Sequence, residues 1–189
     1  MTDGVEDLRN YFYTVMKLIA AGTASTALVL VAAFLKIAPP WPDGAVQITA
    51  VAQLVVLIVV YQFSARMSRR SVDRNILTAL VVLILGALAY LALFSLIVYE
   101  IPTDHSRGVK GFFCSPEGLM VYKDACPFLS DTMFAQATFN ADQVWTPMGL
   151  LLSRLSLFTT WIAMFASLVV LFGSFVAFQR RRKVRPTPA

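Results

Sequence analysis

Four long apolar runs dominate this sequence, near residues 18–35, 45–65, 76–99 and 155–178. Each run is close to the roughly 20 residues that a helix needs to cross a bilayer. A helix at the surface of a soluble protein is apolar along one stripe only, whereas these runs are apolar all round. We therefore predict an all-α integral membrane protein with four transmembrane helices.

The composition agrees with a chain that is mostly embedded in lipid. Hydrophobic residues make up 58% of the 189 residues and charged residues 14%, against roughly 25% charged residues in soluble domains. This length predicts a single four-helix transmembrane domain over 1–189, with no room for a separate soluble domain. The acidic start, with Asp3, Glu6 and Asp7, differs from the basic start of a cleavable signal peptide. We expect the first span to be retained.

Positive charge is distributed unevenly between the segments that connect the runs. If the N-terminus lies in the cytoplasm, 11 of the 16 Lys and Arg residues fall on the inner side and five on the outer side. Because basic residues beside a span resist translocation, we expect both termini in the cytoplasm, a basic cytoplasmic tail at 179–189 and residence in the inner (plasma) membrane. The basic cytoplasmic face comprises Arg66, Arg69, Arg70, Arg74, Arg180, Arg181, Arg182 and Lys183. We expect it to contact membrane lipid or a cytoplasmic protein partner, without direct nucleic-acid binding.

Small residues within the spans predict close helix packing. Such residues let two helices approach in a membrane, either at a specific seam between subunits or as ordinary packing inside one bundle. The first run is almost entirely small over 20–27, so we expect a homo-oligomer with this span at or near the interface. The predicted packing residues are Ala21, Gly22, Ser25, Thr26, Gly86 and Gly173.

The connection over 101–147 is long for so small a protein and carries both cysteines, Cys114 and Cys126. Loops of this length are usually functional or separately ordered. Two cysteines on the oxidising side of a membrane most simply form one disulfide. We therefore predict an extracytoplasmic, disulfide-braced loop. Its many aromatic and Met residues favour a small cap over the bundle, with a contact surface as the alternative.

The sequence shows no recognisable catalytic constellation, so we expect a protein without enzymatic activity, cofactor or metal. No Asp, Glu or His lies deep in any run, and this argues against ion-coupled transport. Glu100, Asp104 and His105 form a loose acidic group whose spacing matches no strong metal-binding motif. Gln53 lies deep in the second run and needs a hydrogen-bond partner, which favours a structural bond between helices. Asp73 or Asn75 is the expected N-cap of the third span.

The sequence contains no family-specific motif, and its architecture alone is similar to two groups. One is the animal tetraspan junction proteins, which have a disulfide in an outer loop. The other is the small four-span membrane subunits of bacterial phage-defence systems such as Kiwa. The second resemblance implies antiviral defence and a cytoplasmic effector, and no functional residue carries over from it.

Our functional hypothesis is a non-enzymatic, oligomeric membrane component that acts as a sensor or an anchor. It would couple the outer loop to a cytoplasmic partner. One alternative is a pore-forming channel or toxic membrane effector, because several copies could enclose a hydrophobically gated pore. The other is a lipid- or quinone-linked enzyme, which would need a catalytic group near the outer loop.

Overall fold

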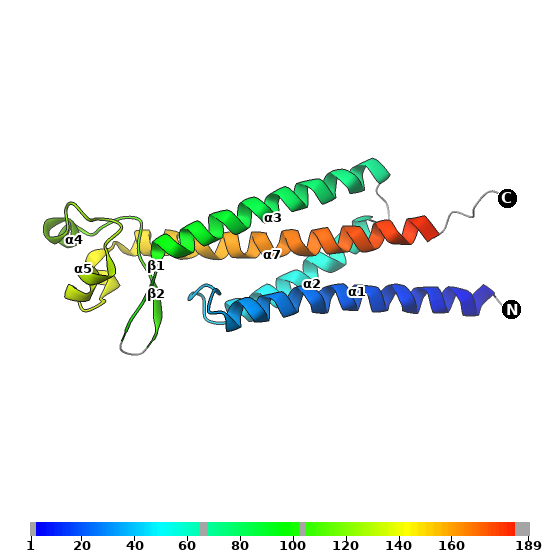
Figure 1. Ribbon diagram of the computed structural model, residues 1–189, viewed down its shortest axis with the longest axis horizontal. Helices are drawn as coiled ribbons and strands as arrows, with labels where there is room; N and C mark the ends of the chain where they lie inside the picture. The colour runs from blue at the N-terminus through cyan, green and yellow to red at the C-terminus, as the bar shows by residue number, and fades with distance from the viewer. Residues whose placement is uncertain (1–2, 65–67, 103–104, 184–189) are drawn as a thin grey trace. The chain divides into compact units, whose positions relative to one another are not determined.

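The chain is mostly helical (Figure 1). The computed structural model describes residues 3–64, 68–102 and 105–183. Its elements are α1 (Asp3–Phe34), α2 (Ala45–Ser64), α3 (Arg69–Ile97), β1 (Val98–Glu100), β2 (Arg107–Val109), α4 (Pro116–Val121), α5 (Asp131–Gln136), α6 (Ala141–Val144) and α7 (Pro147–Lys183).

Three of the described helices contain stretches long and apolar enough to cross a membrane: Ala45–Phe63, Arg70–Ile97 and Pro147–Val176. α1 adds a shorter apolar stretch, Gly22–Phe34. These helices suggest a multi-pass membrane protein. Over 18 residues of each stretch, 11% is buried in α2 and in α3, whereas 28% is buried in α7. Among these three helices, α7 therefore has the most buried apolar stretch.

The chain divides into two compact units. The first comprises Met1–Ala38, Val46–Leu85 and Ile162–Ala189, and the second comprises Pro39–Ala45 and Gly86–Trp161. α3 and α7 each run through the boundary without a break, so both long helices contribute residues to each unit.

In the first unit, Leu57 of α2 lies between two glycines of other helices. A Cβ added at Gly22 of α1 would lie 3.2 Å from Leu57 Cδ2, and one added at Gly173 of α7 would lie 3.6 Å from Leu57 Cδ1. The Gly173 Cβ would also come within 2.9 Å of Val60 Cγ1. Because the glycines carry no side chain, α1 and α7 both approach the same face of α2 closely.

The second unit contains the cap, which we define as residues 98–146. β1 and β2 form an antiparallel hairpin in which Val98 pairs with Val109 and Glu100 pairs with Arg107. The short helices α4, α5 and α6 follow the hairpin and lead into α7. The buried core consists of Tyr99, Leu129, Phe134, Val144, Trp145 and Leu150. Edge-on ring contacts connect this core, with centroids 4.8 Å apart for Tyr99 and Phe134 and 4.9 Å apart for Phe134 and Trp145. Such pairs add to the free energy gained by burial.

Several boundaries differ from those expected. α7 begins at Pro147 rather than near 155, and α3 begins at Arg69 rather than near 76. Asp73 and Asn75 lie inside α3, so the prediction that one of them caps this helix is wrong. The Ser68 hydroxyl accepts a hydrogen bond from the Ser71 N–H at 3.3 Å instead, as an N-cap serine does. The third span also ends earlier than expected, because β1 begins at Val98.

Gly173→Leu should destabilise the first unit by roughly 1–3 kcal/mol, because the new side chain must enter space that Val60 occupies. The measurement is the thermal unfolding midpoint of the purified protein in mild detergent. Ala89→Leu is the control, since Ala89 is exposed on α3. An equal loss of stability in both variants would contradict the prediction.

Candidate functional site

Cys114 and Cys126 form a disulfide, as predicted from the sequence, with their Cα atoms 6.3 Å apart. Cys114 also forms an antiparallel bridge with Trp145, and the Trp145 indole N–H donates to the carbonyl oxygen of Pro127 at 3.0 Å. The bond therefore joins two cap segments that both contact the central Trp145. Both cysteines are partly buried and pack against the cap core, so the disulfide braces the core at its edge.

A buried lysine makes a second cross-connection within the cap. Lys110 is only 8% exposed. Its ammonium donates to the Leu129 carbonyl oxygen at 2.8 Å and to Asp131 Oδ1 at 2.9 Å. Burying a charge is costly unless it is paired and hydrogen-bonded, and both conditions hold here. From the sequence alone Lys110 is only one of the five expected outer cations, because its partners lie about 20 residues further along the chain and no motif links them.

Burial in the cap core raises the pKa of Tyr99 above its ordinary value near 10. The positive charge of Arg154 opposes this shift, and the negative charge of Asp142 adds to it. The phenol is therefore held in its neutral form, because an ionised phenolate is disfavoured in an apolar core.

The surface of the cap carries an uncovered apolar feature on α4. Ser115 caps this helix by accepting a hydrogen bond from the Gly118 N–H at 2.9 Å. The last residues of the helix are exposed: Leu119 by 48%, Met120 by 85% and Val121 by 70%. We call these three residues the α4 tip. The cap core is already formed by other side chains, so the tip is available for contact outside the cap.

The expected acidic group is only partly assembled by the structure. His105 Nδ1 lies 3.1 Å from Glu100 Oε1, and both side chains are exposed beside the hairpin. Asp104 lies outside the described residues. Within the part of the chain that the structure describes, no three His, Cys, Asp or Glu side chains are grouped so that they could hold a metal ion.

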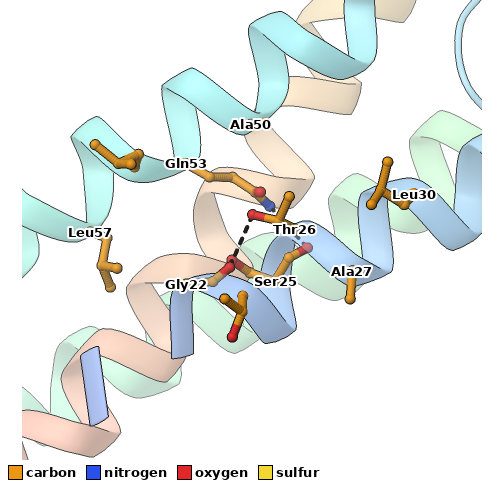
Figure 2. Close-up of a pocket in the computed structure, with 10 residues that line it drawn as sticks. Gly22, Ser25, Thr26, Ala27, Leu30, Ala50, Gln53 and Leu57 are labelled. Atoms are coloured by element: carbon orange, nitrogen blue, oxygen red, sulfur yellow. Dashed lines mark hydrogen bonds between the residues drawn. The ribbon is translucent and has the colours of Figure 1, made fainter. Parts of the chain in front are cut away.

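An apolar hollow that bears a few polar groups lies between α1 and α2 in the first unit (Figure 2). Its volume is about 540 Å³. We call it the α1–α2 groove; it is lined by Gly22, Thr23, Ser25, Thr26, Ala27 and Leu30 of α1 and by Ala50, Gln53, Leu54 and Leu57 of α2. The Gln53 side chain reaches from α2 to α1, where its amide nitrogen lies 3.5 Å from the Ser25 carbonyl oxygen.

The remaining predicted packing residues occupy different surroundings. Ser25 is buried and Thr26 is half-buried on the side of α1 that faces α2. Gly86 is half-buried in α3, within the second unit. Ala21 belongs to α1. Gly22 and Gly173 are the two that the structure brings together, one on each side of Leu57.

Part of the basic face surrounds a second hollow, at the start of α3. Ser68, Arg70, Ser71 and Arg74 line a volume of about 450 Å³. Arg69 is the first residue of α3, while Arg66 lies outside the described residues. The other basic residues of this face, Arg180, Arg181, Arg182 and Lys183, form the last turn of α7.

Comparison with known proteins shows no match: no family model, no curated protein and no solved structure matches this chain.

Replacing both cysteines by serine should destabilise the cap by roughly 3 kcal/mol, because the disulfide closes a loop with a sequence separation of 12. Limited proteolysis should then cut within 98–146 faster than in the natural chain. Membrane extraction should show the variant still inserted, since the apolar helices drive insertion. Equal proteolysis rates for the two proteins would count against a bracing role.

The stability of the cap should fall as the pH rises above about 10. Tyr99 stays neutral in the folded cap, whereas in the unfolded chain it ionises near its ordinary pKa of about 10. The stabilisation is therefore complete below that value and is lost as the pH rises through the higher pKa of the folded state. Thermal unfolding followed by near-ultraviolet circular dichroism, from about pH 8 to about pH 11, measures this.

Tyr99→Phe should weaken the alkaline loss of stability, because it removes the ionisable hydroxyl and keeps the ring contact with Phe134. Tyr122→Phe is the matched control, since Tyr122 packs only at the edge of the same core. The interpretation fails if Tyr99→Phe and the natural chain lose the same stability over this pH range.

Proposed function

We propose that this protein is a non-enzymatic, oligomeric component of the inner membrane that acts as a sensor or an anchor. In this proposal α1 is a fourth span beside α2, α3 and α7. Both termini lie in the cytoplasm and the cap lies outside. The excess of Lys and Arg on the inner side supports this orientation, and the cysteine pair in the cap suits an oxidising compartment.

The observation that carries the proposal is the direct attachment of an ordered cap to two long helices. β1 begins at Val98, immediately after α3 ends at Ile97, and the Lys110 N–H donates to the Ile97 carbonyl oxygen at 2.7 Å. At the other end of the cap, only Thr146 separates the fully buried Trp145 from Pro147, where α7 begins. A change at the cap would therefore act on α3 and α7 without a flexible linker between them.

The α4 tip supports a recognition role for the cap. Met120 and Val121 expose apolar surface that the cap core does not need. Uncovered apolar patches on folded proteins commonly mark contact surfaces. The proposed contact is a protein or lipid surface on the outer side of the membrane.

Small exposed residues on α1 support self-association. Ser25 faces α2, whereas Ala20 and Ala24 are exposed elsewhere on the same helix, outside the α1–α2 groove. Lipid gives no reason to prefer small side chains on an exposed face, but a neighbouring helix does. A second copy of the chain is the proposed neighbour.

The hollow around Arg70 and Arg74 supports a cytoplasmic contact of acidic character. Arg70 and Arg74 are both exposed, so an acidic protein surface could pair with them. The architectural resemblance to phage-defence membrane subunits agrees with such an arrangement, in which a membrane protein holds a cytoplasmic effector.

Co-purification from native membranes in mild detergent tests the proposal. The natural chain should elute as an oligomer together with a cytoplasmic partner. Arg70→Gln combined with Arg74→Gln should release the partner and leave the oligomer intact, because the acidic contact is lost. The charge-matched control is Lys36→Gln combined with Lys123→Gln, which removes two cations from the proposed outer side. This control variant should retain both the oligomer and the partner.

A second variant separates a sensor from an anchor. Met120→Ser combined with Val121→Ser removes apolar surface from the α4 tip, and Glu117→Ser combined with Lys123→Ser alters neighbouring surface without that loss. A sensor predicts that only the tip variant changes how much partner is retained, whereas an anchor predicts no change. A monomer that recovers no partner in any variant would refute the proposal, as would ion flux through liposomes that contain the purified protein.

A further inference from the structure

The α1–α2 groove contains a buried polar atom whose hydrogen bonding is incomplete. Gln53 is only 3% exposed. Its amide nitrogen faces the Ser25 carbonyl oxygen at 3.5 Å, while its side-chain oxygen Oε1 is buried without a hydrogen-bond partner. Because a carbonyl oxygen can only accept, the nitrogen of the amide must be the atom that faces Ser25. The unsatisfied group is therefore an acceptor.

The rest of the lining offers no donor to that oxygen. The hydroxyls of Ser25 and Thr26 both donate to the Gly22 carbonyl oxygen, at 2.9 Å and 3.0 Å, as Figure 2 shows for Thr26. Thr23 donates to the Ala20 carbonyl oxygen at 3.0 Å. A partner for Gln53 must therefore come from outside the lining, and in an apolar surrounding an unsatisfied polar group is costly.

The groove also limits the charge and size of an occupant. Its lining carries no Asp, Glu, Lys, Arg or His, so an ionised head group would find no counter-charge there. Its volume of about 540 Å³ lies within the range of sites for single small molecules. The walls beyond Gln53 are the apolar side chains of residues such as Leu30, Leu54 and Leu57.

We propose that the α1–α2 groove binds a neutral amphiphile that bears a hydroxyl group, with the hydroxyl donating to Gln53 Oε1 and the apolar body lying against the leucines. Lipid alcohols with one or two chains have this chemistry. Neighbouring atoms cover the oxygen, so binding requires the amide to turn toward the groove while the backbone of α2 stays in place. The proposal does not depend on the sensor or anchor role, because the site lies within one chain.

Photolabelling in phosphatidylcholine nanodiscs tests this proposal. The probe is hexadecanol with a diazirine in its chain, and the comparison compound is its methyl ether, which lacks the donor hydrogen. Mass spectrometry locates the labelled residues. The alcohol should label 22–30 and 50–57 roughly two- to tenfold more than the ether does, the range expected for one hydrogen bond. This comparison uses the natural chain and so does not depend on how a variant folds.

Two variants sharpen the test. Gln53→Met keeps an unbranched side chain but removes the amide, and it should reduce alcohol labelling to the level of the ether. Gln62→Met makes the same change in α2 at an exposed position outside the groove, and labelling should be unchanged. Competition with unlabelled hexadecanol or with unlabelled diacylglycerol then distinguishes a one-chain from a two-chain occupant.

Equal labelling by the alcohol and the ether would overturn the proposal, because acyl chains would then fill the groove whatever their head group. Groove labelling in the monomer that vanishes in the oligomer would also overturn it and would assign the groove to a helix of a second copy. A Gln53→Met variant that is labelled as strongly as the natural chain would remove Gln53 from the site.

Discussion

Hydrogen bonding of polar groups in an apolar surrounding is the constraint on which the helical part of this protein depends. Without water, each backbone group must find its partner inside the chain, and a helix meets that requirement by itself. The side chains follow the same rule. The hydroxyls of Ser153 and Thr159 donate to backbone carbonyl oxygens one turn earlier in α7, at 3.0 Å and 2.8 Å. Gln53 departs from the rule at its oxygen atom, and for that reason the groove beside it is the proposed binding site.

Helix association in such a surrounding needs close approach, since lipid and leucine are equally apolar. The structure provides that approach at Leu57, where Gly22 and Gly173 leave room on two sides. The same side chain also lines the α1–α2 groove. Packing and the proposed binding of a lipid alcohol therefore share α2, and a ligand that moved this helix would change its contact with α7.

The cap is built on a different principle from the helices. Its stability rests on an aromatic core, a disulfide and the buried ammonium of Lys110, each of which joins segments that are distant in sequence. These interactions leave the α4 tip outside the core. A cap that is braced internally can present apolar surface without losing its fold, which suits the recognition role proposed for it.

The sequence by itself determined the helical class, the apolar stretches of α2, α3 and α7, and the pairing of Cys114 with Cys126. The continuous apolar character of the runs, their length and the presence of only two cysteines are local or compositional properties, so no tertiary information was needed. The start of α3 at Arg69 does not follow from the apolar run, because the charged and polar residues before it resemble a loop, although the arginines among them are good helix formers. Only the tertiary structure decided that Lys110 meets Asp131, that Gly22 and Gly173 face one leucine, and that Gln53 is left with an unpaired oxygen. Each of these facts depends on which helix face or cap segment lies opposite, and spacing along a chain does not encode that when no motif links the partners.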